Sequence, residues 1–448
     1  MNKKEIIIVG AGLGGSILAN GLADKWNITI IEAADSLPLI KNRVNDIDSP
    51  ARTDPHICSG LGGTTQLWHN GLIEIEESIF NNRWPFSKQS IEKYYEKAIH
   101  ILSGKDRNLI KQKSKLLLKK YIDAGFNENC FREWLFYPKS RINPWDKLKL
   151  KDRVRLIKGE VINAEVSKDG NINHLLVNIK GQTQKVKGDI FVFATGGLST
   201  PILIDKISNS NNNLNIKNSG YNYEDHPTAL VGELKLNKPL FKLWNFPFEN
   251  GNLRLPIIVV VDGLRMSFQL RPSANSIFMN RKKRVKNVIN ELRNNLFNPV
   301  LYFKLLTHVD DMMEMLSFLF NINFPTSSYT ITMVAEQPSS NFRAIWEGEN
   351  SSINRKWVID EDLMEVYNRG INKAISMLEG NILSSTIYND WKSNIYTSSH
   401  HSGTARMASA SDKGVCDLNT KVFGVENLYI CDGSVIPATG TANTGLTI

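Results

Sequence analysis

Three glycines directly after a short apolar segment constrain the fold of this chain more than any other feature of its sequence. Residues 5–9 read Glu-Ile-Ile-Ile-Val, and Gly10, Gly12 and Gly15 follow in the spacing G-x-G-x-x-G. Such an apolar run is typical of a buried parallel strand, and the residues after it are expected to form a helix. Glycine permits the tight turn, the approach of a pyrophosphate and close helix–strand packing. The segment therefore predicts a βαβ unit that binds a dinucleotide.

An acidic residue after the second predicted strand narrows the choice of dinucleotide. Residues 28–31 form that strand, and Glu32 follows it, where a carboxylate can accept hydrogen bonds from ribose hydroxyls. Its charge disfavours a 2′-phosphate, so FAD or NAD is expected in preference to NADP. Free N–H groups at the helix start, near Leu13 and Gly14, would hold the phosphates. A glycine-rich turn without a ligand is the alternative.

Two further segments have the composition of cofactor-binding turns. Residues 60–71 combine paired glycines with Thr64 and Thr65, which could hold a phosphate or a flavin ring. Residues 193–201 run from an apolar strand through small residues into a helix that is expected to begin near Pro201. Small residues at this turn would let a planar cofactor lie against the backbone. Read alone, each segment is also compatible with an ordinary structural turn.

The carboxyl-terminal part of the chain carries the most distinctive motifs. Residues 399–407 read Ser-His-His-Ser-Gly-Thr-Ala-Arg-Met, and residues 428–437 read Leu-Tyr-Ile-Cys-Asp-Gly-Ser-Val-Ile-Pro. Residues 440–448 read Gly-Thr-Ala-Asn-Thr-Gly-Leu-Thr-Ile. The imidazole of a histidine has an unperturbed pKa of about 6.5, which suits proton transfer near neutral pH.

Taken together, these motifs resemble those of the glucose–methanol–choline (GMC) flavoprotein oxidoreductases. That family has an amino-terminal FAD fingerprint, a GG[ST][ST] segment, a WP…YY..A helix, an ATGG…P turn and the carboxyl-terminal run quoted above. The helix motif here is Trp84-Pro85 with Tyr94, Tyr95 and Ala98, so matches extend along the whole chain. The resemblance implies an α/β (α+β) fold, in which a Rossmann-like FAD-binding domain is interleaved with a substrate domain of antiparallel sheet and helices.

We expect both domains to be assembled from separate stretches of chain. The FAD-binding domain is assigned to residues 1–80, 152–235 and 396–448, and the substrate-binding or cap domain to residues 81–151 and 236–395. The assignment follows the sequence pattern, which becomes helical after the amino-terminal segments, returns to short strands, mixes both types, and ends in short strands with glycine-rich turns.

The resemblance also implies roles for individual residues. In this family a histidine removes the proton of the substrate hydroxyl while the carbinol hydride moves to flavin N5. His400, three residues before Gly403, falls on that histidine, and the adjacent His401 is expected to have a packing or supporting role. Asn443 falls on a second active-site position, where an amide can hold and orient the substrate oxygen. Alternatively, Asn443 only shapes the glycine-rich turn.

The residues expected to bind the cofactor come from all of these segments. Asp432 and Gly433 resemble residues that meet the ribityl and pyrophosphate groups of FAD, and the backbone of Val161 is expected to face the adenine. No metal site is expected. The full set expected to contact the cofactor is Gly10, Gly12, Leu13, Gly14, Gly15, Glu32, Gly63, Thr64, Thr65, Val161, Ala194, Thr195, Gly196, Asp432, Gly433 and Thr444.

The sequence therefore predicts an FAD-dependent oxidoreductase that acts on the CH–OH group of an alcohol or sugar-like substrate, as a dehydrogenase in preference to an oxidase. Some relatives attach FAD covalently through a histidine at the position of Leu67, so FAD is expected to be non-covalent here. His226, in a stretch similar to the family's DHP, is expected to be structural. Two alternatives stay open: a flavin-containing lyase, and a truncated non-catalytic flavoprotein, since relatives usually continue with a helix after the position of Ile448.

Composition removes other classes of protein. Apolar residues make up 42% and charged residues 22% of the 448, which argues against disorder, collagen and coiled coil. The net charge of +9 favours anionic partners without choosing among them, and no motif supports nucleic-acid binding. Four cysteines without a CxxC pair argue against a disulfide scaffold or zinc site. Without a signal-peptide core or membrane-spanning run, a cytoplasmic location is expected.

One segment suggests contact with a membrane. A basic cluster at residues 281–284 precedes an apolar stretch that extends to residue 320, and such a pairing can lie on an anionic membrane surface. The protein would then be peripheral to the inner membrane surface, and its substrate could be lipid-linked. A solvated charged turn followed by a core helix is the alternative. The identity of the substrate and of the electron acceptor stays open at this level.

Overall fold

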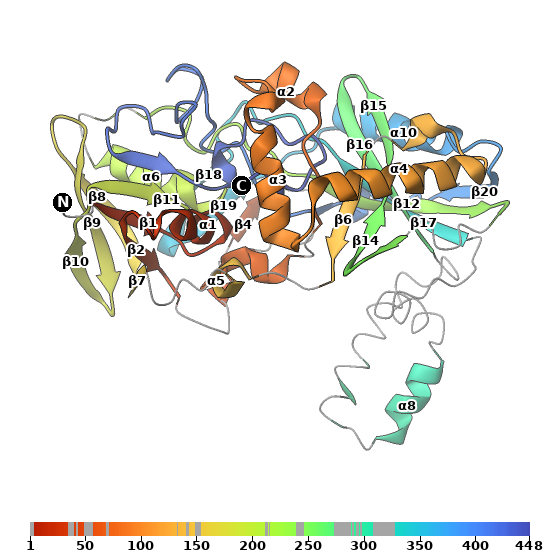
Figure 1. The fold of residues 1–448 in the computed structure, drawn as a ribbon, viewed down its shortest axis with the longest axis horizontal. Helices are drawn as coiled ribbons and strands as arrows, with labels where there is room; N and C mark the ends of the chain where they lie inside the picture. The colour runs from red at the N-terminus through yellow and green to blue at the C-terminus, as the bar shows by residue number, and fades with distance from the viewer. Residues whose placement is uncertain are drawn as a thin grey trace.

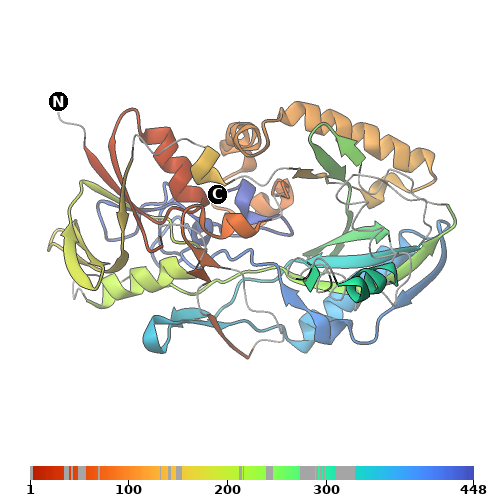
Figure 2. The same cartoon turned by 90° about the horizontal axis from the view of Figure 1, so that it is seen from below.

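The computed structural model describes residues 4–34, 40–41, 44–48, 57–68, 71–131, 133–139, 143–147, 154–210, 214, 216–238, 246–272, 288, 291–292, 295, 298–307 and 328–448. These residues form two lobes, one around a parallel sheet and one around an antiparallel sheet (Figures 1 and 2). The basic cluster at 281–284 and the apolar residues 308–320 lie outside the described residues. Helix α8 (Pro299–Leu306) is the described part of that apolar stretch.

A five-stranded parallel sheet forms the core of the first lobe. Its strand order is β22-β11-β1-β2-β7, and each neighbouring pair is parallel. The side chains of Ile6, Ile7 and Ile8 are buried on both faces of this sheet, which explains the uninterrupted apolar run in β1. The elements of this lobe are β1 (Glu5–Val9), α1 (Leu13–Leu22), β2 (Asn27–Glu32), β7 (Val154–Lys158), the meander β8 (Glu160–Val166), β9 (Ile172–Ile179) and β10 (Gln182–Val186), β11 (Ile190–Phe193), α6 (Ser199–Asn209) and β22 (Leu428–Ile430).

A six-stranded antiparallel sheet forms the core of the second lobe. Its order is β15-β16-β17-β12-β20, with β21 paired to β12. Met266 and Phe268 of β16 are fully buried among apolar side chains, whereas Ser267, Gln269 and Arg271 alternate with them and so point to the opposite face. The elements of this lobe are β12 (Pro227–Leu236), β15 (Ile257–Val261), β16 (Leu264–Pro272), β17 (Ser328–Ala335), α10 (Glu361–Ser376), β20 (Ile382–Ile387) and β21 (Tyr396–Thr397).

Two helices from the first third of the chain pack against the core of the second lobe. Tyr95 and Ile99 of α3 and Leu117 of α4 belong to the same apolar cluster as Met266 and Phe268 of β16. The remaining elements are β3 (Ile40–Lys41), β4 (Val44–Ile47), β5 (Cys58–Ser59), η1 (Gly63–Leu67), α2 (Glu77–Arg83), η2 (Lys88–Ser90), α3 (Glu92–Ser103), α4 (Arg107–Asp123), η3 (Glu128–Cys130), β6 (Leu135–Pro138), α5 (Pro144–Lys147), β13 (Phe246–Phe248), β14 (Gly251–Arg254), β18 (Ile345–Glu347), η6 (Glu349–Ser351), β19 (Ile353–Lys356), η7 (Trp391–Asn394), η8 (Gly433–Val435) and η9 (Thr444–Leu446).

The architecture is the expected mixed one, a Rossmann-like parallel sheet beside an antiparallel sheet with helices. The predicted boundary at residue 235 differs from the sheet topology. Strand β12 starts at Pro227 and pairs with β17 and β20, so the chain enters the second lobe before β12 rather than after it. Hydropathy marks a strand but not the sheet that it joins, because both sheets bury apolar side chains. No helix within the described ranges has both the length and the apolar content needed to cross a membrane.

Candidate active site

The turn between β1 and α1 leaves no room for a side chain at Gly10, Gly14 or Gly15. Gly10 has a φ of +102°, and a Cβ on it would lie 2.5 Å from the carbonyl oxygen of Ala194. A Cβ on Gly14 would collide with the carbonyl oxygen of Cys431, and one on Gly15 with that of Gly10. The turn therefore packs directly against the ends of β11 and β22, and the start of α1 is open to a ligand.

Glu32 joins this turn to a second glycine-rich segment. Its carboxylate accepts hydrogen bonds from the backbone N–H groups of Ala11 at 2.8 Å and Gly60 at 2.9 Å. Burial raises the pKa of Glu32, and hydrogen bonds from Ala11, Ala34 and Gly60 oppose that rise. Glu32 thus holds two loops together at the end of β2, beside the cavity described below.

Asp432 joins the turns that follow β11 and β22, at the other side of the sheet. Its carboxylate accepts hydrogen bonds from the Gly196 N–H at 2.8 Å, the Thr200 hydroxyl at 2.6 Å and the Ser434 N–H at 2.9 Å. The turn after β11 is therefore fixed to the turn after β22. Small residues at both turns, including Ala194 and Gly433, leave space next to the backbone.

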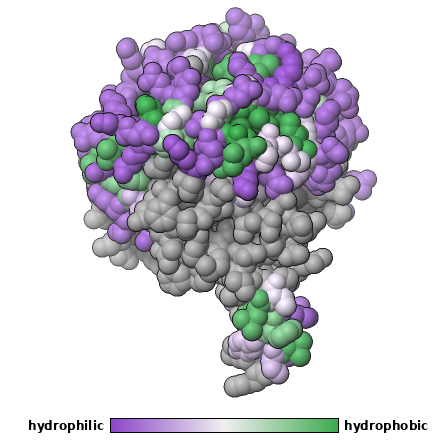
Figure 3. Space-filling view, turned by 90° about the vertical axis from the view of Figure 1, so that its right-hand side faces the viewer, coloured by the Kyte–Doolittle hydropathy of each residue, from purple (hydrophilic) through white to green (hydrophobic). Residues whose placement is uncertain are grey.

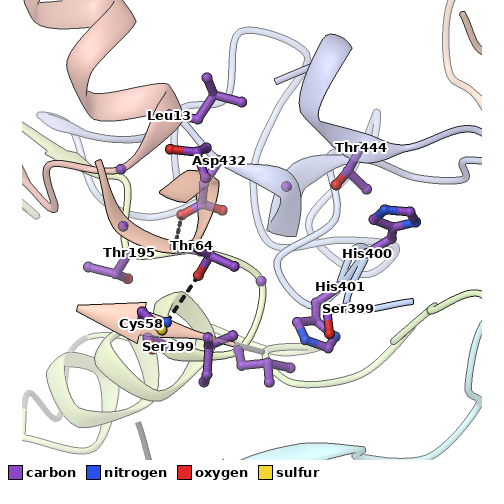
Figure 4. Close-up of a pocket in the computed structure, with 18 of the residues that line it drawn as sticks. Leu13, Cys58, Thr64, Thr195, Ser199, Ser399, His400, His401, Asp432 and Thr444 are labelled. Atoms are coloured by element: carbon purple, nitrogen blue, oxygen red, sulfur yellow. Dashed lines mark hydrogen bonds between the residues drawn. The ribbon is translucent and has the colours of Figure 1, made fainter. Parts of the chain in front are cut away.

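These segments surround one cavity of about 990 Å³. Figure 4 shows several of them converging on it, among them Leu13 from α1, Thr64 next to Cys58, Asp432 and Thr444. Gly15 does not line the cavity, because it is packed against Gly10 and Ala194. All other residues expected to bind the cofactor line it: Gly10, Gly12, Leu13, Gly14, Glu32, Gly63, Thr64, Thr65, Val161, Ala194, Thr195, Gly196, Asp432, Gly433 and Thr444.

The chemistry of this lining fits FAD. The helix start at Gly12 and Leu13 offers backbone N–H groups to a pyrophosphate, and the carboxylate of Glu32 can accept from ribose hydroxyls. At Gly12 the backbone is open, since a Cβ there would meet no neighbouring atom closer than the carbonyl oxygen of Ala194 at 3.9 Å. The volume lies at the upper end of the roughly 300–1,000 Å³ range of ligand sites, as a dinucleotide requires.

His400 and Asn443 line the same cavity as these residues. The side-chain amide of Asn443 donates to the carbonyl oxygen of Gly71 at 2.9 Å, which fixes its orientation. In Figure 4 the imidazole of His400 points toward Thr444, whereas that of His401 points to the other side of the chain. The structure therefore brings the two expected catalytic positions and the glycine turn to one space.

A chain of hydrogen bonds extends from His400 away from the cavity. Nδ1 of His400 lies 3.0 Å from Nδ1 of His226, and Nε2 of His226 lies 2.8 Å from the hydroxyl of Thr439. Burial, followed by the charge of His400, lowers the pKa of His226 to about 3, so His226 is neutral near pH 7. His226 is therefore in direct contact with His400, beyond the structural role expected from the sequence.

A buried ionic network holds this histidine pair in place. One carboxylate oxygen of Asp225 accepts from the backbone N–H groups of His226 at 2.7 Å and His400 at 3.1 Å. Its other oxygen lies 3.5 Å from Nδ1 of His401 and 3.6 Å from Arg355. Burial alone would raise the pKa of Asp225, but the charges of His401 and Arg355 and the hydroxyl of Thr397 hold it below its usual value. A charged carboxylate thus lies behind both histidines.

Sequence reasoning did not identify the cavity residues that come from the antiparallel sheet and from β6. Tyr137, Gln269, Arg271 and Tyr396 line it, as does Thr332. The alternation of polar and apolar residues in β16 was the available signal, but alternation alone does not say which face meets the cofactor. Arg355 was also missed, since its contact with Asp225 depends on two segments that are distant in the sequence.

Comparison with known proteins agrees with the geometry. Residues 298–448 match the GMC oxidoreductase family. The fold is similar over 99% of this chain to pyridoxine 4-oxidase from Mesorbium loti (96% of that chain, TM-score 0.64, 13% identity). It is similarly close to a variant of formate oxidase from Aspergillus oryzae RIB40, studied for FAD modification (100% and 96% coverage, TM-score 0.61, 13% identity). The carboxyl-terminal part of the chain thus resembles the GMC oxidoreductase family, and the whole chain shares the fold of these oxidases.

A curated relative matches over a short segment. It is the long-chain-alcohol oxidase FAO3 of Arabidopsis thaliana, 33% identical over 57 residues. The aligned segment covers 13% of this chain and spans only 8% of the length of that relative. The similarity is therefore local.

Proposed function

We propose that this protein oxidises the CH–OH group of an alcohol or sugar-like substrate, with non-covalently bound FAD, His400 as base and Asn443 as the amide that orients the substrate hydroxyl. The observation that carries the proposal is the common cavity, which His400 and Asn443 line together with the glycine turn at Gly10 and Gly12. The relatives named above are oxidases of pyridoxine, formate or long-chain alcohols, which supports oxidoreductase chemistry.

FAD, when bound, supplies the hydride acceptor. His400 accepts the hydroxyl proton at Nε2, which requires that its Nδ1 carry the ring hydrogen and donate it to Nδ1 of His226. His226 is then the acceptor at Nδ1, and its own ring hydrogen at Nε2 is donated to Thr439. Because His226 holds a single ring hydrogen at neutral pH, this arrangement satisfies both contacts.

Asp225 stabilises His400 after proton uptake. Its carboxylate is fully buried and already bonded to the backbone N–H of His400, so it supplies a negative charge next to the imidazolium that forms. The amide of Asn443, held by the Gly71 carbonyl, can donate its second N–H to the substrate oxygen.

The electron acceptor in this proposal is a carrier rather than oxygen, which makes the protein a dehydrogenase. The relatives of known structure that resemble it are oxidases, so the distinction requires measurement. Reoxidation of reduced protein by air-saturated buffer, compared with reoxidation by a quinone-like dye, decides it: the dye should be faster by at least about tenfold, and equal or faster reaction with oxygen would identify an oxidase.

Anaerobic mixing of the purified flavoprotein with a panel of alcohols and sugars tests the reaction. At least one compound should bleach the visible absorbance of oxidised flavin. His400→Ala should slow bleaching about 10²–10⁴-fold with FAD retained, whereas His100→Ala, an exposed histidine on α3, should leave it unchanged. Acid precipitation should release the flavin if it is non-covalent. Bound flavin that no compound reduces would favour a lyase or a non-catalytic protein, and an unchanged rate in His400→Ala would remove His400 from the mechanism.

A further inference from the structure

One face of the antiparallel sheet lines the same cavity as the glycine turn. Ser267, Gln269 and Arg271 occupy alternate positions of β16, and all three line the cavity. Thr332 and Val334 of β17, paired to Gln269 and Ser267, line it as well. The opposite face of these strands is apolar and buried. This wall is therefore polar, and its outermost position carries a guanidinium group.

Positive charge on this wall is not matched by carboxylates. The described strands of the six-stranded sheet contribute no acidic residue to the cavity lining, and Arg271 has no ion pair with a described carboxylate. The acidic residues of the lining lie elsewhere. Glu32, Glu160 and Asp432 belong to the parallel-sheet lobe. Glu347 is paired with Lys206 of α6 at 2.8 Å, and Glu349 lies in η6.

A second guanidinium group, that of Arg254, is buried next to the lining residue Tyr137 and does not itself line the cavity. Tyr137 lines the cavity. The guanidinium carbon of Arg254, on β14, lies 4.6 Å from the centroid of the Tyr137 ring. Burial, with a contribution from the like charge of Arg271, lowers the pKa of Arg254 to about 10. Tyr396 is another lining residue. Burial raises the pKa of its hydroxyl, and the charge of Arg271 opposes that rise. An anion bound in the cavity at Arg271 would offset the repulsion between the two guanidinium groups.

We propose that the substrate is an alcohol that carries an anionic group, a carboxylate or a phosphate, and that Arg271 binds this group while the hydroxyl is presented to His400 and Asn443. The inference rests on the proposed function for the chemistry at His400, but the anion site itself does not depend on turnover. Gln269 and Thr332, on the same wall, are placed to donate further hydrogen bonds to the anion. Planar guanidinium groups bind carboxylate and phosphate through paired hydrogen bonds.

Matched pairs of substrates test the proposal. Each pair has the same length and differs only in charge: 4-(hydroxymethyl)benzoate against its amide, and 6-hydroxyhexanoate against its amide. A charged hydrogen-bonded contact should raise kcat/KM for the anion over the amide by about 10–100-fold in at least one pair. Arg271→Gln should reduce that ratio to near one, chiefly through KM, and Arg271→Lys should give an intermediate ratio. Arg369→Gln removes the same charge from an exposed ion pair with Asp262 and should leave the ratio unchanged.

Binding without turnover separates this inference from the proposed function. 4-Methylbenzoate and 4-methylbenzamide have no hydroxyl group, so calorimetric titration of the FAD-loaded protein measures their affinities alone. The benzoate should bind at least about tenfold more tightly than the amide, and Arg271→Gln should abolish the difference. If Arg271→Gln abolishes the difference in affinity while no alcohol reduces the flavin, the anion site is supported and the proposed alcohol oxidation is refuted. Equal affinities in the wild-type protein, or a preference that survives Arg271→Gln, would overturn the inference even if alcohols are oxidised.

Discussion

Substitution of His226 by leucine would remove the acceptor for the Nδ1 hydrogen of His400 without changing the charge of the site. A hydrogen bond to a charged group contributes about 1.5–3 kcal/mol, and each pKa unit corresponds to about 1.4 kcal/mol. Burial already lowers the pKa of His400, against the opposing charge of Asp225. The bond from Nδ1 of His400 to His226 is stronger when His400 is protonated, so the variant destabilises the protonated form more than the neutral one, and the pKa of His400 should fall further, by about one to two units.

The pH dependence of flavin reduction measures this change. Its acid limb reports the ionisation of the base, so His226→Leu should move the midpoint to lower pH by about one to two units and lower the plateau roughly 10–100-fold. His226→Asn offers the Oδ1 atom as acceptor near the position of Nδ1 and should recover most of both. The other ionisable groups near His400 are Asp225, His401 and, through Asp225, Arg355; they are unchanged in both variants.

A merely structural role for His226 would give a different result. The leucine and asparagine variants would then lose both activity and thermal stability to the same extent. Neither would shift the midpoint of the pH dependence of flavin reduction. A midpoint that is unchanged or higher in His226→Leu would refute the assignment of the hydrogen at Nδ1 of His400. Thr439→Val removes the acceptor of the ring hydrogen at Nε2 of His226 and provides an independent check if the leucine variant does not fold. It should slow reduction without changing the charge of the network.

Two further predictions concern stability and the surface. Arg107 donates two hydrogen bonds of 2.6 Å to the buried carboxylate of Glu74. Arg107→Leu leaves this carboxylate without its main partner, so the free energy of unfolding measured with denaturant at pH 7 should fall by about 3–5 kcal/mol. Burial would raise the pKa of Glu74, but Arg107 holds it below its usual value. The stabilisation by Arg107 is therefore complete above the pKa that Glu74 has in the unfolded chain. The difference in unfolding free energy between wild type and Arg107→Leu should shrink as pH falls through the lower pKa that Glu74 has in the folded protein. Helix α8 exposes Phe303, whose side chain is 69% exposed, with other apolar side chains (Figure 3). The protein should therefore bind anionic liposomes in a flotation assay, and a variant with residues 281–284 neutralised, or Phe303→Ser, should bind less. Equal binding by wild type and variants would contradict membrane contact.

Much of the first lobe followed from local sequence rules. The apolar run of β1 and the glycines after it allow few alternatives, because only a buried parallel strand followed by a tight turn satisfies both. Helix α10 also follows a local pattern, since its buried residues Met364, Tyr367, Ile371 and Ala374 recur on one face of the helix. The boundary before β12 was not readable, because a strand's sheet partners are chosen by long-range pairing.

The candidate site divides in the same way. The positions of His400 and Asn443 in their motifs could be assigned from the sequence by resemblance, and the structure brings both to the cavity. Their supporting contacts could not. Segment 399–402 lies beside segment 224–226 through a bridge between Glu224 and Ser402, and this approach alone creates the contact between His226 and His400.

By itself, the sequence determined the glycine turn, the strands around it and the order of the motifs along the chain, since these depend on backbone freedom and on the local spacing of apolar side chains. Only the tertiary structure decided which side chains from distant segments meet. Arg271 faces the cavity and Arg355 meets Asp225 because strand register and lobe packing set those distances. Electrostatic interactions depend on separation in space, and separation along the chain does not specify it.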